Sequence, residues 1–204
     1  MNKLPLFLFA LFLLACGRQA RELPYLGHHE VNAAGDSVYH RIPDFSFVNQ
    51  DGDTLTQAFI DGKVYVADFF FSTCPTICPV MKSQMLRIYE KYKGNDSLII
   101  LSHSINPRYD TPEVLHRYKE KLGVTSPQWQ FLTGTQTNVY QLAQNSYLTS
   151  ALEDSSAVED GGFIHSGAFV LIDQDRHIRA IYDGTKEKEV DKLMAAIDQL
   201  LARN

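Results

Sequence analysis

Residues 64–81 read V-Y-V-A-D-F-F-F-S-T-C-P-T-I-C-P-V-M, and this stretch decides the fold. Its first eight residues, Val64 to Phe71, are apolar apart from Asp68, which predicts a strand buried on both faces of a sheet. Two cysteines follow, Cys74 and Cys78, each directly before a proline. Apolar residues at helical spacing then continue toward Gly94 and predict a helix. A buried strand, a cysteine loop and a helix therefore come in that order.

Strand and helix patterns alternate through the rest of the chain. Further strands are predicted at residues 97–105 and 129–132, hairpins at 42–55 and 167–182, and helices at 111–122, 138–147 and up to Leu201. Residues 148–162 are acidic and aperiodic, which predicts a solvated loop.

This order of elements predicts one domain over residues 41–204. Strands that alternate with helices pair in parallel, while hairpins add antiparallel strands. We therefore expect a thioredoxin-like α/β sandwich with an N-terminal β-hairpin and a mixed central sheet flanked by helices. Open α/β sheets keep their sites at the carboxyl ends of the strands, which is where Cys74 and Cys78 fall.

The first residues are typical of a targeting signal. A positive start and an apolar run from Leu4 to Leu14 precede L-L-A-C, which resembles the lipobox of bacterial lipoproteins and ends at Cys16. We predict a lipoprotein signal peptide over residues 1–15 and a lipidated Cys16, with a plain secretory signal as the alternative. Residues 16–40 then form a tether. The protein is expected to be exported and to face the periplasm or the cell exterior from a membrane.

The cysteine count and the charge narrow the function further. If Cys16 of the three cysteines carries lipid, Cys74 and Cys78 are left as partners, either in a disulfide, as a cycling redox pair or as metal ligands. The formal net charge of −5 and the scattered basic residues indicate no nucleic-acid-binding surface.

The prolines predict where the sulfur atoms lie. Proline disfavours helical geometry in the residue before it, so Pro79 is expected to open the helix with Cys78 at the cap position and Cys74 in the preceding loop. A helix N-terminus favours the thiolate, which both redox chemistry and metal binding require.

A third ligand is expected, because two ligands seldom hold a metal tightly. Three residues between the cysteines leave room for two sulfurs around one ion. Among seven histidines, His165 stands out, because it precedes the strand A-F-V-L-I-D in a loop that faces the cysteine loop of a thioredoxin-like sheet. The other six, including His103 at a strand end, are predicted to be surface or structural residues.

Three segments together resemble the Sco/SenC family of copper-binding assembly proteins. They are F-F-F-S-T-C-P-T-I-C-P-V-M, S-I-N-P-R-Y-D-T-P-E-V-L and I-H-S-G-A-F-V-L-I-D. The resemblance covers residues 43–201 and implies a membrane-anchored domain that binds Cu(I) or Cu(II) through Cys74, Cys78 and His165. It further implies a copper chaperone that matures the dinuclear copper site of cytochrome c oxidase. The partners would be the copper-receiving subunit of that oxidase and a thiol reductant or copper donor protein.

Two positions depart from the family pattern, and one residue supports a rival function. Asn106 stands where the family commonly has Asp, and Ile164 where it often has an acidic residue, which concerns partner recognition. Asp68 lies six residues before Cys74, in the relation that a buried aspartate of thioredoxins bears to their first redox cysteine. The alternative function is thus a thiol–disulfide oxidoreductase that uses Cys74, Cys78 and Asp68, although Asp68 can equally be a buried acid satisfied by a neighbour.

Overall fold

The computed structural model describes residues 22–203. The predicted signal peptide, residues 1–15, and the predicted lipid site at Cys16 lie outside this range. Among the described residues, no helix is long and apolar enough to cross a membrane.

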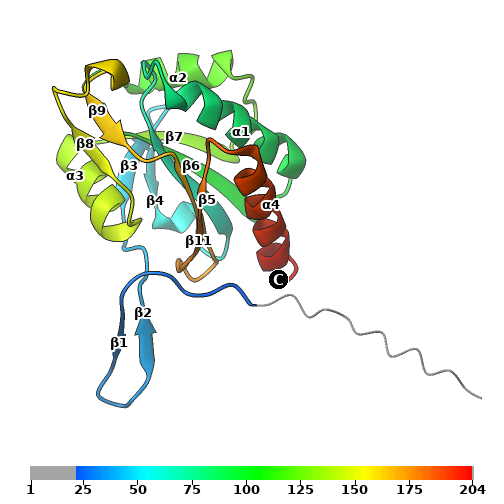
Figure 1. Cartoon of the computed structure of the whole chain (residues 1–204). Helices are drawn as coiled ribbons and strands as arrows, with labels where there is room; N and C mark the ends of the chain where they lie inside the picture. Colours follow the sequence, from blue (N-terminus) through cyan, green and yellow to red (C-terminus); the bar gives the residue numbers. More distant parts are fainter. Residues whose placement is uncertain (1–21, 204) are drawn as a thin grey trace, which may run out of the picture.

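A seven-stranded mixed sheet forms the centre of the molecule (Figure 1). Its strand order is β11-β10-β5-β6-β7-β3-β4. The strands β5 (Val64–Phe70), β6 (Leu98–Ser104) and β7 (Trp129–Thr133) pair in parallel, and every residue in them is buried. The remaining strands pair antiparallel: β3 (Ser46–Asn49), β4 (Thr54–Thr56), β10 (Ala168–Ile172) and β11 (Ile178–Asp183). The predicted mixed sheet with two hairpins is confirmed.

Helices cover both faces of this sheet. The helices α1 (Ile77–Tyr92), α2 (Pro112–Lys121) and α4 (Glu187–Leu201) lie on one face. There Phe70 of β5 stacks on Tyr118 of α2 and lies beneath the ammonium group of Lys82 of α1. The helix α3 (Gln136–Gln141) continues into a π-helical turn, Leu142–Ser146, on the other face, where Tyr147 packs on Phe69. The predicted sandwich is therefore present.

The helix after the cysteines starts earlier than predicted. It begins at Ile77, with Thr76 as its N-cap, so Cys78 lies in the first turn and not at the cap position. Pro79 fits there because the N–H groups of the first turn have no carbonyl partner within the helix. By contrast, the predicted cap of α2 is confirmed, since the Thr111 side chain accepts a hydrogen bond from the Val114 amide.

The acidic segment 148–162 is a loop only in part, which corrects the prediction. It contains the strand β8 (Ala151–Glu153) and a short 3-10 turn, Val158–Asp160, and β8 pairs antiparallel with β9 (Phe163–His165). The pattern is hidden because the strands are three residues long and the turn bends at Gly161 and Gly162, whose φ angles are 72° and 86°. This hairpin ends at His165.

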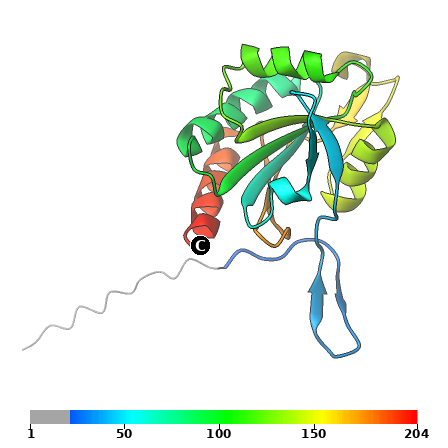
Figure 2. The ribbon, with the colours of Figure 1, turned by 180° about the vertical axis from the view of Figure 1, so that it is seen from behind.

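The predicted tether is also partly folded, which corrects the prediction for residues 22–40. The strands β1 (His29–Val31) and β2 (Ser37–Tyr39) form a hairpin that projects from the sandwich (Figure 1, Figure 2). The Leu26 amide donates to the Ile178 carbonyl over 2.8 Å, so the chain before the hairpin lies along β11. Exposed three-residue strands have no apolar periodicity that sequence analysis could detect.

Candidate metal centre

Both cysteines lie where the first central strand ends. Cys74 is in the loop directly after β5, and its amide donates to the Phe71 carbonyl over 3.2 Å. Cys78 is in the first turn of α1, and both residues are buried. Their thiols are not joined in a disulfide. The predicted position at the carboxyl edge of the sheet is confirmed.

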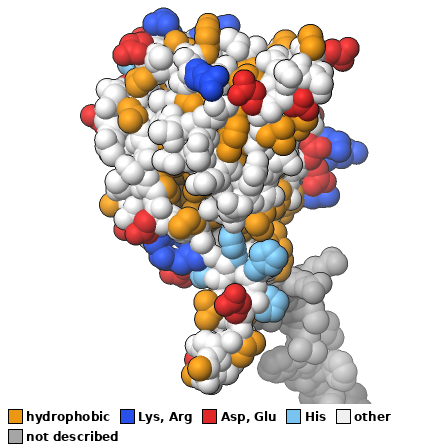
Figure 3. Space-filling model, turned by 90° about the vertical axis from the view of Figure 1, so that its left-hand side faces the viewer, with side chains coloured by type: hydrophobic (Ala, Val, Ile, Leu, Met, Phe, Trp, Pro, Cys, Tyr) orange, Lys and Arg blue, Asp and Glu red, His pale blue; other side chains and the backbone are white. Residues whose placement is uncertain are grey.

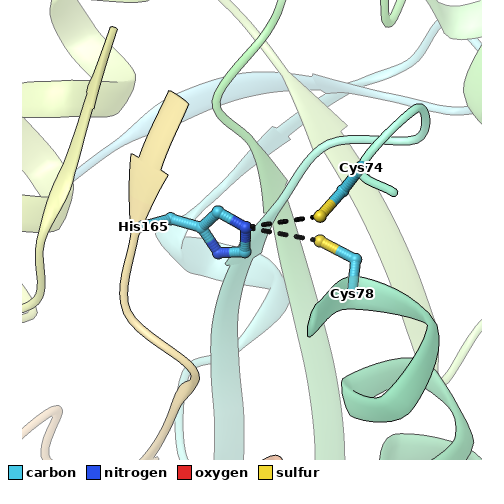
Figure 4. Close-up of side chains that lie close together, drawn as sticks. All are labelled: Cys74, Cys78 and His165. Atoms are coloured by element: carbon cyan, nitrogen blue, oxygen red, sulfur yellow. Dashed lines mark hydrogen bonds between the residues drawn. The ribbon is translucent and has the colours of Figure 1, made fainter. Parts of the chain in front are cut away.

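The imidazole of His165 meets both sulfurs (Figure 4). Its Nε2 lies 3.7 Å from the Cys74 Sγ and 3.6 Å from the Cys78 Sγ. Among the residues that the structure describes, these three form the only group of three or more His, Cys, Asp and Glu side chains whose ligand atoms could share one ion. The structure thus brings together the three ligands expected from the sequence.

The separation of these atoms fits a bound metal. Metal–sulfur bonds of about 2.3 Å and metal–nitrogen bonds of about 2.0 Å, about 120° apart, place sulfur and nitrogen about 3.7 Å from each other. The observed 3.7 and 3.6 Å match this geometry. With all three ligand atoms within 4.8 Å of one another, the group could hold one metal ion.

The hairpin β8–β9 holds His165 in place. Ala151 pairs with His165 in its register, and the Ser166 amide donates to the Ser150 carbonyl over 3.1 Å. A Cβ atom on Gly161 would lie 3.2 Å from the Phe71 ring, so the turn of the hairpin packs closely on the cysteine loop. The sequence segment that looked like a solvated loop is therefore the support of the third ligand.

Aromatic packing orients the imidazole. The ring of His165 meets Phe71 edge-on at 5.6 Å between centroids, and Phe163 packs on Phe71 at 4.8 Å. The Nδ1 of His165 is buried without a hydrogen-bond partner. Metal-bound histidines usually donate this second nitrogen to a carboxylate or carbonyl, so here packing and not a hydrogen bond orients the Nδ1 side of the ring.

A buried carboxylate that the sequence analysis did not single out anchors the cysteine loop. Asp110 accepts hydrogen bonds from the Ser72 amide at 3.1 Å and from the hydroxyls of Ser72 and Ser104. Burial raises the pKa of Asp110, and the hydrogen bonds from Ser104 and Ser72 oppose this. Asp110 thus ties the chain after β6 to the residues that lead into Cys74. Its place directly before the helix cap Thr111 was the available signal.

The two thiols differ strongly in acidity. The Cys78 thiol donates a hydrogen bond to the Cys74 sulfur, and this, with help from His165 and nearby amides, lowers the pKa of Cys74 to about 3 against the effect of burial. The pKa of Cys78 is raised far above its ordinary value, first by its hydrogen bond to Cys74 and then by burial. The pair therefore carries a single negative charge at neutral pH, located on Cys74.

Asp68 is tied to a buried lysine. Its carboxylate binds the Lys82 ammonium group at 2.6 Å and accepts a hydrogen bond from the Ser102 hydroxyl. Lys82 is 2% exposed and lies one helical turn after Cys78. Asp68 thus reaches the cysteine helix through Lys82, and its contacts are those of a buried acid satisfied by neighbours. Lys82 was missed because a lysine in an apolar helix stripe is expected to be solvated.

The other histidines are structural or exposed, as predicted. His103 is buried among Phe45, Phe47, Phe69 and Tyr147, and burial lowers its pKa to about 3. Neither of its ring nitrogens has a hydrogen-bond partner. It behaves as a neutral aromatic residue of the core.

Comparisons with known proteins agree with this geometry. A family model described as SCO1/SenC matches residues 34–202. The crystal structure of a SCO1/SenC family lipoprotein from Bacillus anthracis is 27% identical with a TM-score of 0.72, over 79% of this chain and 95% of that one. BsSco, described as a member of the Sco family of cytochrome c oxidase assembly proteins, is 27% identical with a TM-score of 0.69, over 79% and 93%. Yeast Sco1 with copper bound is 27% identical with a TM-score of 0.58, over 78% and 89%. The predicted thioredoxin-like architecture is thereby confirmed.

The first prediction concerns the thiolate of Cys74. In the reduced, metal-free protein, a pKa of about 3 keeps Cys74 ionised at every pH above about 4, so the ultraviolet absorbance of thiolates should stay at one per chain from about pH 5 to 8. Cys74→Ser should remove this absorbance, because burial still raises the pKa of Cys78 after its hydrogen bond to Cys74 is lost. An absorbance that appears only with a midpoint near that of an ordinary cysteine, about 8.5, would contradict the asymmetry.

The second prediction concerns the buried ion pair beneath α1. Lys82→Met leaves the Asp68 carboxylate buried and unpaired, and should lower the free energy of unfolding by about 3–5 kcal/mol in urea denaturation. The double variant Lys82→Met/Asp68→Asn should recover much of that loss, because no unpaired charge remains.

Lys91→Met is the matched control for this pair. Lys91 lies on the same helix as Lys82 and binds Asp198 of α4, but both side chains are about half exposed, so the loss should not exceed about 1 kcal/mol. Equal losses for Lys82→Met and Lys91→Met would show that burial gives the Asp68 pair no special importance.

Proposed function

Because the chain belongs to the SCO1/SenC family, we propose that it is a copper chaperone that delivers copper to the copper-receiving subunit of cytochrome c oxidase. The observation that carries this proposal is the convergence of Cys74, Cys78 and His165 at distances that suit one ion. Copper-bound yeast Sco1 and the assembly role stated for BsSco support the choice of cargo and of partner.

The donor set fits copper. Thiolate sulfur is a soft ligand that favours Cu(I), and an imidazole nitrogen binds Cu(I) and Cu(II) alike. Cys74 is already a thiolate before the metal arrives, while Cys78 must lose its proton when it binds. Cys74 is therefore the first ligand to capture the ion, and Cys78 closes the site after it.

Release follows from the open coordination. Three ligands leave room for a fourth, so a thiolate of the acceptor can bind the ion while Cys74, Cys78 and His165 still hold it. The ligands of this chain then leave one after another, with no change in copper valence. His165 is suited to leave early, because its Nδ1 has no hydrogen bond that would fix the ring. Reloading requires both thiols reduced, which calls for a thiol reductant and a copper donor protein.

A lipid anchor completes the proposal. The motif L-L-A-C places an acylated cysteine at residue 16 of an exported protein, so the domain works beside the membrane that holds the acceptor. The likeness to a SCO1/SenC family lipoprotein supports this anchor.

The unequal thiols favour one alternative, a thiol–disulfide oxidoreductase. The Cys74 thiolate would attack a disulfide of the acceptor, forming a mixed disulfide and releasing one acceptor thiolate. The deprotonated Cys78 sulfur would then attack Cys74 and release the second acceptor thiol. Two electrons pass to the acceptor, Cys74 and Cys78 end as a disulfide, and a thiol reductant restores them.

The third prediction separates the two functions. The reduced protein should bind a single copper ion per chain, and His165→Ala should weaken Cu(I) binding by at least about tenfold in competition with a chelator, because one of three ligands is gone. His116→Ala is the matched control, since His116 is half exposed and pairs with Asp51 away from the site.

Reduction of a model disulfide substrate is assayed in parallel on the same variants. The chaperone proposal expects slow reduction. Fast reduction that is unchanged in His165→Ala, together with unchanged copper affinity, would favour the oxidoreductase and contradict the chaperone.

A further inference from the structure

The end of the domain opposite the metal centre carries a separate structure, which we call the foot. The foot comprises residues 22–44: an extended segment up to Leu26, the hairpin β1–β2, and the segment that leads into the first strand of the sandwich. In Figure 1 the hairpin projects from the lower end of the molecule, away from the β8–β9 hairpin.

A buried arginine fixes the extended segment of the foot that precedes the hairpin. Arg179 of β11 is 3% exposed, and its guanidinium donates to the carbonyls of Pro24, at 3.1 Å, and Leu23. The same group binds the buried Asp173 carboxylate at 2.8 Å and lies 4.1 Å above the Tyr25 ring. The chain from residue 22 is therefore fixed to the sandwich.

The segment of the foot that follows the hairpin is fixed to the turn that joins β10 and β11. The Ile42 amide donates to the Arg176 carbonyl at 2.9 Å, and the Arg176 side chain binds Asp44 at 2.6 Å. Arg41 donates to the Asp175 carbonyl at 2.8 Å. The segments before and after the hairpin thus attach at the same end of the sheet.

Strand register shows that this end is the far one from the metal centre. Ile178 of β11 pairs with Ile172 of β10, and Ile172 pairs with Tyr65 at the start of β5. From there β5 runs to Phe70, just before the cysteine loop, a distance of about 17 Å at the usual rise of a strand. The length of the sheet therefore separates the foot from the three ligands.

Little chain remains between the foot and the proposed anchor. Glu22 is six residues after Cys16, and six Cα–Cα steps span at most about 20 Å when fully extended. Had residues 16–40 all been a free tether, the reach would have been about four times longer. An anchor at residue 16 must therefore keep the foot close to the membrane.

The surface of the foot suits a lipid headgroup region. Four large apolar or aromatic side chains are exposed there: Tyr25 (40%), Val31 (68%), Val38 (53%) and Tyr39 (40%). The rings of Tyr25 and Tyr39 stack at 4.2 Å, and tyrosine is enriched at membrane–water interfaces. Residues 22–40 include three acidic residues, Glu22, Glu30 and Asp36, and no lysine or arginine, so apolar contact and not attraction to anionic headgroups is what they offer to lipid. In Figure 3 the hairpin stands clear of the domain.

We propose that the foot rests on the bilayer that holds residue 16, with Val31, Val38 and the two tyrosines among the headgroups, and that it presents Cys74, Cys78 and His165 away from the membrane. This proposal rests on the proposed anchoring of the chain. It also defines the partner: an acceptor whose receiving thiols stand well outside the bilayer, by about the length of the sheet or more.

Energy transfer to the membrane tests the orientation. Two samples of full-length protein are prepared, with p-azidophenylalanine replacing either Ala34 in the foot or Val158 in the turn of the β8–β9 hairpin, and a donor dye is attached to it. Each sample is reconstituted in phosphatidylcholine vesicles that carry an acceptor dye on their headgroups. Both positions are exposed. Transfer should be severalfold stronger from position 34 than from 158. Equal transfer from the two positions, or stronger transfer from 158, would overturn the proposal, as would a chain that does not enter membranes.

A second pair of variants tests contact with lipid itself. A twenty-residue Gly-Ser insertion between Ala20 and Arg21 removes the short tether as a cause of proximity. Strong transfer from position 34 should persist in this background and fall severalfold on Val31→Asp/Val38→Asp, whereas Val158→Asp should leave it unchanged. If the insertion alone abolishes the transfer, the foot has no affinity for lipid and the proposal fails.

Copper binding is measured in the same vesicles, which keeps the two proposals apart. Normal copper binding without the expected orientation would refute only the proposal that the foot rests on the bilayer. The expected orientation without copper binding would support the proposed membrane contact of the foot and refute the proposed copper-chaperone function.

Discussion

The metal centre depends on one contact between hairpin and loop, the packing of β8–β9 against the residues after β5. The parallel sheet fixes where Cys74 and Cys78 can lie, but the third ligand comes from a strand of three residues outside that sheet. Close approach of Gly161 to Phe71, and of Phe163 to the same ring, brings the His165 Nε2 to within 3.7 Å of both sulfurs. Without that packing the protein would hold two thiols and no metal site.

Buried polar groups make the sulfur side of the site rigid, whereas on the imidazole side the ring is oriented by aromatic packing, with no polar side chain behind it. Asp110 fixes the chain before Cys74, and the Lys82–Asp68 pair fastens the first turns of α1 to the sheet. His165 has no comparable support at its Nδ1. This difference suits a carrier, because a ligand that is easily released lets the ion pass to a partner while two fixed sulfurs keep the empty site in shape.

Sequence patterns were sufficient to predict an element or a site residue where the pattern is long or the residue type is rare. The continuous apolar runs of β5 and β6, the Thr111 cap of α2 and the three ligand residues were all predicted before any coordinates. The start of α1, the β8–β9 hairpin and the folded part of residues 22–40 were not. Each of these depends on tertiary contacts: three-residue strands have no detectable period, and Pro79 is tolerated within the first helical turn. Lys82 and Asp110 escaped notice because the contacts that matter here, to Asp68 and to Ser72, reach across 14 and 38 residues of the chain.

The two proposals place capture of the ion at one end of the sheet and attachment to the membrane at the other. The first of these proposals depends on whether the three side chains at the carboxyl edge of the sheet hold copper together, and X-ray absorption at the copper edge measures this directly. The reduced, copper-loaded protein should show two sulfur atoms and one imidazole nitrogen around copper. A shell of sulfur alone, unchanged in His165→Ala, would contradict the account.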